Sequence, residues 1–200
     1  MDFRSGKIGP GLDFDFLPVF RTSRLILRHV GPENFEQLLL HENQDAVRSF
    51  LNATDDLIWA EQLRRFSNGL SSWNNSFCHF FLFSSDTLTP VGYCGFHQMH
   101  PGHRKAELGY SLYEEHFKRQ GLMTEAVDFV IQYGFDTLKL IRIEAMTGTD
   151  NVASTRILEK KGFQKEGFLR KNYLRNGMAE DSVMFALLNE KELELLGNKA

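Results

Sequence analysis

The feature that most constrains the fold is a strand, a loop and a helix that follow one another at residues 106–138. Residues 106–112 (AELGYSL) alternate in character, which predicts a β-strand with Leu108 on one face and Glu107 on the other. After a basic loop, apolar residues recur at helical spacing, which predicts an amphipathic helix. The unit therefore predicts a fold of the α/β (α+β) type, in which a carboxylate projects from a strand opposite its apolar face.

The loop before this helix is predicted to bind an anion. A basic strand-to-helix turn leaves helical N–H groups unpaired at the positive end of the helix dipole, and a glycine lets a phosphate approach the backbone. Lys118 and Arg119 flank this turn, and Gly121 is its glycine. Taken alone, the same pattern also fits an ordinary loop.

The rest of the chain predicts one domain with an N-terminal arm and a C-terminal tail. Glycine and proline punctuate residues 1–21, which predicts an extended arm, and residues 22–188 carry the domain. A short charged helix is predicted within residues 189–200. Within the domain we expect, in order, a strand (22–29), two or three helices (within 32–73), three strands (78–83, 91–99 and 106–112), a helix, a strand (141–147), a helix from Asn151, and a hairpin (163–174 and 181–188) around Asn176-Gly177.

Composition and charge exclude several classes of protein. The net charge is −3, from 23 Lys and Arg against 26 Asp and Glu, which argues against a protein that coats nucleic acid or an anionic membrane. Because no apolar run approaches the length of a membrane span and the N-terminus lacks a secretory pattern, we expect a cytoplasmic protein without a membrane partner. Cys78 and Cys94 each lie in an apolar run, which predicts buried, reduced thiols.

Motifs for metal and nucleotide chemistry are not convincing. The chain has no P-loop, nucleophile-elbow or zincin pattern. His97, His100 and His103 are spaced three residues apart, but Pro101-Gly102 is expected to place them across a turn rather than on one face. We therefore expect no metal site.

Five segments resemble the motifs of one family, in the order in which that family carries them. They are residues 22–28 (TSRLILR), 106–112 (AELGYSL), 120–126 (QGLMTEA), 150–154 (DNVAS) and 158–163 (LEKKGF). On these segments the chain resembles the GCN5-related N-acetyltransferase (GNAT) superfamily, and within it the RimJ/RimL-type branch that acetylates ribosomal-protein N-termini in bacteria. That superfamily usually has Gly or Ala where this chain has Met123, so we expect the Met123 backbone to face the phosphate and its side chain to point into the fold.

The resemblance implies both a fold and a reaction. The fold is a single domain with a central mixed, mostly antiparallel sheet of about six to seven strands flanked by helices, splayed between its fourth and fifth strands (106–112 and 141–147). The reaction is direct transfer of acetyl from acetyl-CoA to a primary amine, without a metal. The implied partners are acetyl-CoA and an amine acceptor, with no nucleic acid, and the implied assembly is a monomer or a homodimer.

The resemblance also implies roles for individual residues. Glu107 is the preferred general base, with Glu144 on the next strand as its competitor. Ser154 would protonate the leaving thiolate, with Tyr173 as the weaker alternative. The implied cofactor contacts are the backbone near Ser111 and Leu112 for the thioester oxygen and pantetheine, Asn151 and Ser154 for pantetheine, and, for the pyrophosphate, the loop at Lys118, Arg119, Gln120, Gly121, Leu122, Met123 and Thr124. The basic cluster of Arg156, Lys160 and Lys161 is a candidate for the 3′-phosphate. In the alternative interpretation, Asn151 simply caps its helix and Arg156 lies on a solvated helix face.

No sequence motif identifies the acceptor amine. An N-terminal α-amine with a pKa of about 7.7–8.0 is roughly one-tenth neutral at pH 7, whereas a lysine amine is neutral in only about one molecule in 2,500. A modest carboxylate base therefore suits an N-terminal α-amine, which is the acceptor that the resemblance implies. A polyamine, an amino acid or an aminoglycoside remains an alternative acceptor, and a non-catalytic acetyl-CoA sensor remains an alternative function.

Overall fold

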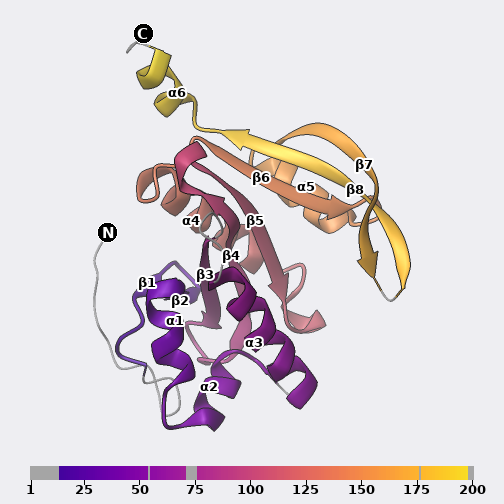
Figure 1. Ribbon diagram of the computed structural model, residues 1–200. Coiled ribbons are helices and arrows are strands. Elements are labelled where there is room, and N and C mark those ends of the chain that lie inside the picture. The colour runs from indigo at the N-terminus through magenta and orange to yellow at the C-terminus, as the bar shows by residue number, and fades with distance from the viewer. Residues whose placement is uncertain (1–13, 54, 71–75, 176, 198–200) are drawn as a thin grey trace.

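An eight-stranded mixed sheet forms the centre of the fold in the computed structural model, which describes residues 14–53, 55–70, 76–175 and 177–197 (Figure 1). The strands are β1 (Val19–Arg21), β2 (Leu25–Val30), β3 (Ser76–Ser84), β4 (Pro90–His100), β5 (Lys105–Leu112), β6 (Arg142–Gly148), β7 (Gln164–Arg175) and β8 (Met178–Leu188). Their order in the sheet is β1-β2-β3-β4-β5-β6-β8-β7, and β5 and β6 run parallel while the other neighbouring pairs are antiparallel. The predicted mixed, mostly antiparallel sheet is confirmed, with one strand more than the six to seven expected.

Three helices follow β2, which agrees with the two or three helices predicted there. The helices are α1 (Pro32–Leu39), α2 (Gln44–Phe50), α3 (Asp56–Leu70), α4 (Leu122–Asp136), α5 (Val152–Lys160) and α6 (Glu190–Gly197), with single 3₁₀ turns at η1 (Pro101–His103) and η2 (Glu115–Phe117). The predicted end of the third helix at 71–73 and Asn176 of the hairpin turn lie outside the described residues. Residues 198–200 of the predicted tail also lie outside them.

Two hydrophobic cores lie on opposite faces of the sheet. The alternating side chains of β3 show the division, because Phe80 packs with α4 in one core while Phe77 and Phe81 pack with α1 and α2 in the other. Strand β2 is buried along its whole length, so even Arg28 is only 2% exposed. The sheet is therefore covered on both faces at its N-terminal half.

The N-terminal arm was predicted wrongly in its second half. Val19–Arg21 forms β1, which pairs with β2, and Phe14 and Leu17 are buried in the core that contains α1 and α2. Residues 1–13 of the predicted arm lie outside the described residues. Burial of these apolar side chains against the rest of the fold, rather than any local periodicity, holds this segment in place.

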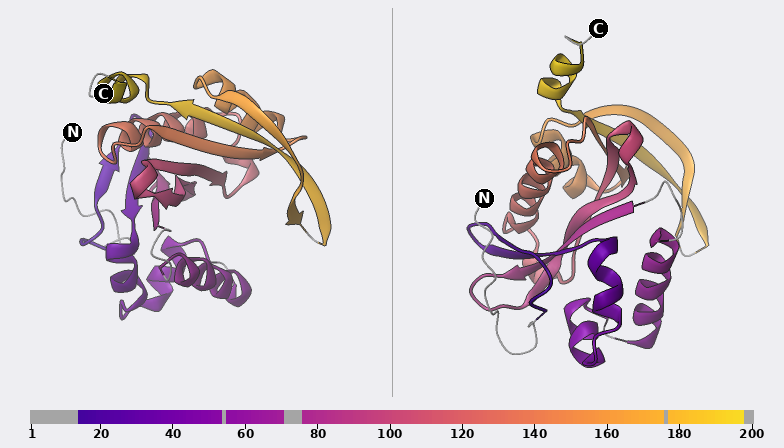
Figure 2. Two further views of the ribbon diagram at one scale, coloured as in Figure 1. Left: turned by 45° about the horizontal axis from the view of Figure 1, so that its top comes forward. Right: turned by 60° about the vertical axis from the view of Figure 1, so that its left-hand side comes forward.

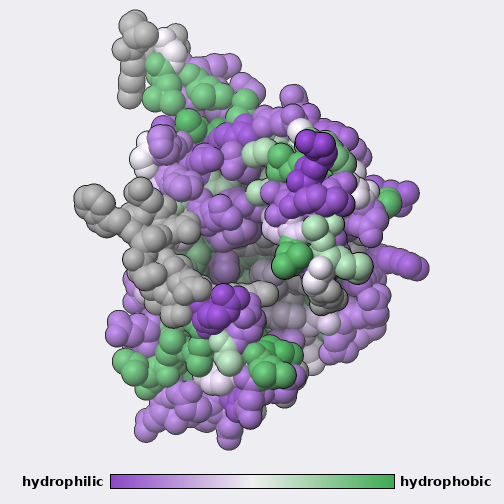
Figure 3. Space-filling view, turned by 45° about the vertical axis from the view of Figure 1, so that its right-hand side comes forward, coloured by the Kyte–Doolittle hydropathy of each residue, from purple (hydrophilic) through white to green (hydrophobic). Residues whose placement is uncertain are grey.

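The β7–β8 hairpin extends beyond the neighbouring strands, as Figure 2 shows at the orange and yellow end of the chain. It exposes the apolar side chains of Phe168, Leu174 and Met178. Figure 3 shows a largely hydrophilic face with small separate hydrophobic patches and a recess near its middle. Among the described residues, no helix combines the length and the apolar character that crossing a membrane requires.

Candidate active site

Strands β5 and β6 part after only three paired residues. The ladder joins Lys105 to Arg142, then one further pair, and ends where Glu107 lies beside Glu144. Each strand continues along its other neighbour, because β5 pairs with β4 as far as Leu112 and β6 pairs with β8 as far as Gly148. The predicted splay is thereby confirmed, and it opens a gap in the middle of the sheet.

The backbone amides of β5 that face this gap can be assigned from the register. The Tyr113 N–H donates to the Val91 carbonyl of β4 at 3.0 Å. Since N–H groups alternate between the two sides of a strand, the amide of Ser111 also faces β4, while those of Tyr110 and Leu112 face the open side. Of the two backbone positions predicted to hold the thioester, Leu112 therefore presents its N–H to the gap.

The loop before α4 presents a second set of amides. Gly121 is the N-cap residue of α4 at φ +77°, and no side chain caps the helix there. The first N–H groups of an α-helix have no intrahelical acceptor, so those of α4 remain available at its positive end. Residues 118–121 are exposed, whereas the Met123 side chain is 6% exposed in the core beneath α4. The expectation that Met123 points into the fold is confirmed.

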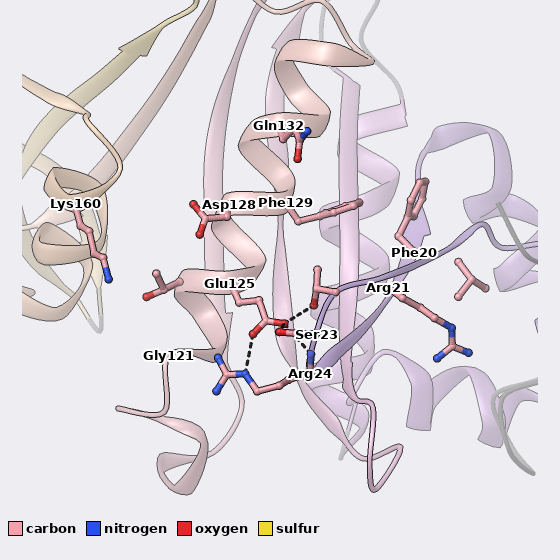
Figure 4. A pocket seen from close by; sticks show the side chains of 13 residues that line it. Phe20, Arg21, Ser23, Arg24, Gly121, Glu125, Asp128, Phe129, Gln132 and Lys160 are labelled. Atoms are coloured by element: carbon pink, nitrogen blue, oxygen red, sulfur yellow. Dashed lines mark hydrogen bonds and ion pairs between the residues drawn. The ribbon is translucent and has the colours of Figure 1, made fainter. Parts of the chain in front are cut away.

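Glu125, in the first turn of α4, fastens this loop to the turn before β2 (Figure 4). Its Oε1 accepts hydrogen bonds from the Thr22 hydroxyl at 2.6 Å, the Ser23 hydroxyl at 2.9 Å and the Arg24 N–H at 2.8 Å. Its Oε2 accepts from Arg24 Nε at 2.8 Å, and Arg24 Nη1 donates to the Gln120 carbonyl at 2.8 Å. Burial alone would raise the pKa of Glu125, but these hydrogen bonds outweigh it and lower the pKa to about 2. We call Thr22, Ser23, Arg24 and Glu125 the clasp.

A cavity of about 1080 Å³ lies beside the clasp, between the β1–β2 connection and α4 (Figure 4). Of the predicted cofactor residues, Gly121 and Thr124 line it, and Lys160 lines it from α5. Among the described residues, none from β5 or β6 belongs to its lining. The cavity therefore borders the loop and is separate from the gap in the sheet.

Two carboxylates lie at the point where the strands part. Glu107 is 5% exposed, and its Oε1 lies 3.2 Å from Nε2 of His97 on β4. Glu144 instead contacts two cations, Arg142 Nε at 2.9 Å and Lys105 Nζ at 3.3 Å. Because register partners in a parallel ladder point to the same face, both carboxylates project to the side of the sheet opposite α4. The negative charge of Glu144 is thus largely offset, while the described contact of Glu107 is a histidine.

The two predicted proton donors lie on different sides of the gap. On β7, the Tyr173 hydroxyl lies 3.6 Å from the Met146 sulfur, and burial together with the negative charge of Glu107 raises the pKa of Tyr173. On α5, the backbone carbonyl of Ser154 accepts a bond of 3.5 Å from the hydroxyl of Tyr110, whose side chain packs on the α4 face. Tyr173 therefore lies on the Glu107 side, and Ser154 lies on the opposite side.

Asn151 performs the capping role that was its alternative interpretation. Its side-chain oxygen accepts a hydrogen bond from the Ser154 N–H at 3.1 Å, which fixes the start of α5. Arg156 is exposed on the same helix. The capping bond fixes the position of Ser154 whether or not Asn151 also contacts a ligand.

Comparison with known proteins decides the family. A family model described as an acetyltransferase (GNAT) domain matches residues 24–164. The chain belongs to the GNAT acetyltransferases. YoaA of Bacillus subtilis, an uncharacterized N-acetyltransferase, is 33% identical over 177 residues, which cover 88% of this chain and 99% of YoaA. YdaF of the same organism, provisionally named a ribosomal N-acetyltransferase, is 27% identical over 175 residues, which cover 85% of this chain and 94% of YdaF.

Solved structures support the GNAT fold. The ribosomal-protein-S5-alanine acetyltransferase from Vibrio fischeri superimposes with a TM-score of 0.63 at 19% identity, covering 86% of this chain and 97% of its own. The spermidine/spermine N-acetyltransferase SpeG from Vibrio cholerae gives 0.62 at 18% identity, covering 87% of this chain and 99% of its own. At these identities the likeness establishes the architecture alone.

The residues of this GNAT enzyme fit the co-substrate of the family, acetyl-CoA. An extended amide-containing arm needs hydrogen-bond partners along a strand, and the gap offers the open side of β5. A pyrophosphate needs N–H donors without competing side chains, and the uncapped start of α4 offers them. Among the described residues, no cluster of three or more His, Cys, Asp or Glu side chains is arranged to hold a metal ion.

Sequence reasoning missed three residues around this GNAT site. His97 was considered with the turn histidines, but it lies in β4 against Glu107, while His100 and His103 contact each other with ring centroids 6.4 Å apart. Tyr110 and Glu125 were not singled out from the sequence as site residues. Each has its partner on another element, so the cross-strand register and the helix packing were needed to find it.

Proposed function

We propose that this GNAT enzyme acetylates the α-amine of a protein N-terminus, with Glu107 as the general base. The observation that carries the proposal is the position of Glu107, which is buried at the last residue of the β5–β6 ladder. An acetyl donor held in the gap would meet an amine approaching from the face of the sheet on which Glu107 lies. A carboxylate there can take the proton that the amine must lose before or during attack.

Glu107 suits this role better than Glu144. Two cations within 3.3 Å hold the Glu144 carboxylate, so its lone pairs are already engaged. Glu107 has His97 as its described ion-pair contact. Of the two carboxylates near the gap, Glu107 therefore has more lone pairs left to accept a proton.

The remaining roles follow from which groups face the gap. As the amine nitrogen bonds to the acetyl carbon, negative charge develops on the thioester oxygen, and the Leu112 and Tyr110 amides, which face the gap, would donate hydrogen bonds to it. When the carbon–sulfur bond breaks, the thiolate needs a proton, for which Ser154 is the proposed donor and Tyr173 the alternative. The amides at the start of α4 and the side chains of Lys118 and Arg119 would hold the pyrophosphate.

The α-amine is proposed on two grounds. YdaF, which aligns along nearly its whole length, bears a name that refers to ribosomal acetylation. A polyamine carries several positive charges and needs several carboxylates, but on the described face near the gap the charge of Glu144 is offset by Arg142 and Lys105. The alternative acceptor is a small amine, since the spermidine acetyltransferase from Vibrio cholerae shares this architecture.

The test is an assay of thiol release from acetyl-CoA against a panel of amines. The panel contains peptides that differ in their first residue, the same peptides with a blocked N-terminus, spermidine and an aminoglycoside. The proposal predicts turnover with free peptides and none with the blocked ones, and Glu107→Gln should abolish most of it. Turnover with spermidine or an aminoglycoside alone would establish the small-amine alternative, and tight acetyl-CoA binding without any turnover would establish a sensor.

A further inference from the structure

His97 lies between the buried Glu107 carboxylate and solvent. The two residues face each other across the β4–β5 ladder, and Nε2 of His97 lies 3.2 Å from Oε1 of Glu107. The side chain of Glu107 is 6% exposed and that of His97 is 39% exposed. A proton on Glu107 therefore has a short path to water through the imidazole.

The position of the His97 ring depends on a glycine. A Cβ atom on Gly109, the next residue of β5 on the same face, would lie 2.9 Å from Cε1 and 3.1 Å from Nδ1 of His97. Real Cβ atoms do not approach other atoms so closely, so any side chain at Gly109 must displace the ring. Gly109 does not have the positive φ that would independently require glycine. The space that it leaves is occupied by His97.

The other charged and titratable groups around Glu107 do not offer the same path. Glu144 on β6 is held by Arg142 and Lys105. Tyr173 on β7 has a raised pKa, so its hydroxyl stays protonated at neutral pH and cannot accept another group's proton. Among the described contacts of Glu107, His97 is thus the titratable side chain that also reaches water.

We propose that His97 relays the amine proton from Glu107 to solvent between turnovers. After acetyl transfer the O–H bond of the Glu107 carboxyl group breaks, an N–H bond forms at Nε2 of neutral His97, and the resulting imidazolium gives one proton to water. The carboxylate and the neutral ring are thereby restored for the next amine. His97 acts through Glu107 and is a positioning residue, and the inference rests on the proposed role of Glu107 as the base.

Three variants and an added base test the relay. His97→Ala should lower kcat about tenfold at pH 7, a fraction of the 10²–10⁴ typical of the general base itself, with KM for acetyl-CoA unchanged. Free imidazole should restore most of that loss in His97→Ala and change neither the wild-type enzyme nor Glu107→Gln. Gly109→Ala should reproduce the loss, and combining it with His97→Ala should add nothing further, because the ring that it displaces is already absent.

The controls separate failure of the relay from failure of the proposed function. His103→Ala, which removes an exposed histidine on η1, should leave kcat unchanged. If His97→Ala does not fold, His97→Gln takes its place, and a normal kcat in that variant overturns the relay. A loss in His97→Ala that does not respond to imidazole also overturns it. Full activity in Glu107→Gln instead overturns the role of Glu107, whatever His97 does.

Discussion

From the hydrogen bonds of the clasp we predict that the Glu125 carboxylate on α4 stabilises the fold at neutral pH and loses this effect in acid. In Glu125→Gln the amide oxygen can still accept the hydrogen bonds of Thr22, Ser23 and the Arg24 N–H. The new amide group, however, faces Arg24 Nε, which is itself a donor, so this bond and the negative charge are both lost. The loop that begins α4 is then held less firmly to the turn before β2.

The expected loss of stability in Glu125→Gln follows from the lowered pKa of Glu125. The difference between the ordinary value of 4.5 and about 2 corresponds to about 3 kcal/mol of stabilisation of the charged form. Because the Arg24 side chain is 48% exposed, solvent screening reduces this, and we expect about 2 kcal/mol. A carboxyl group whose pKa is lowered by folding stabilises the protein above its unfolded pKa, and this contribution disappears as the pH falls from about 4.5 to 2.

Urea unfolding of the wild type and Glu125→Gln at several pH values measures this directly. The difference in the free energy of unfolding should be about 2 kcal/mol at pH 7 and should shrink toward zero as the pH approaches 2. Asp136→Asn, at the exposed end of the same helix, is the matched control and should change stability by no more than about 0.5 kcal/mol. A difference that stays constant with pH, or one that the control reproduces, would refute the reasoning.

Three further predictions concern the reaction. Glu107→Gln should lower kcat about 10²- to 10³-fold at pH 7 and recover in part at higher pH, where more of the amine is already neutral; a pH–rate profile of unchanged shape would remove Glu107 as the base. Gly121→Val, at φ +77°, should raise KM for acetyl-CoA about tenfold because a β-branched residue distorts the loop. An unchanged KM would show that the loop does not bind the cofactor. Ser154→Ala should lower kcat about tenfold while Tyr173→Phe changes it less than about twofold, and the reverse result in steady-state kinetics would make Tyr173 the proton donor.

Most of the fold could be predicted because its elements carry strong local periodicity. Strand β5, helix α4 and the β7–β8 hairpin all occur where alternation, helical spacing and the Asn176-Gly177 turn placed them. Strand β1 could not be predicted, because three residues are too few to show a period and the segment before it is interrupted by Gly and Pro. Its position depends on tertiary burial of Phe14 and Leu17.

The candidate site could be predicted only where a single strand or loop determines it. Alternation along β5 correctly placed Glu107 opposite the α4 face, and the position of Gly121 correctly marked the start of the helix. The contact of His97 with Glu107 depends on the β4–β5 register, which includes an irregularity after His97 that no local pattern reveals. The bonds between Glu125 and Arg24 span about a hundred residues of sequence and arise from packing alone.

The short β5–β6 ladder also has a mechanical consequence. With three paired residues between them, β1–β5 and β6–β8 form two subsheets joined along a narrow seam. A ligand that accepts hydrogen bonds from the open side of β5 would take the place of a short strand between the two subsheets. Its binding free energy would then stabilise the association of the two subsheets. Amide exchange at Tyr110 and Leu112 should therefore slow when acetyl-CoA binds, because a substrate held there, as we propose, would complete a sheet that the chain alone leaves open.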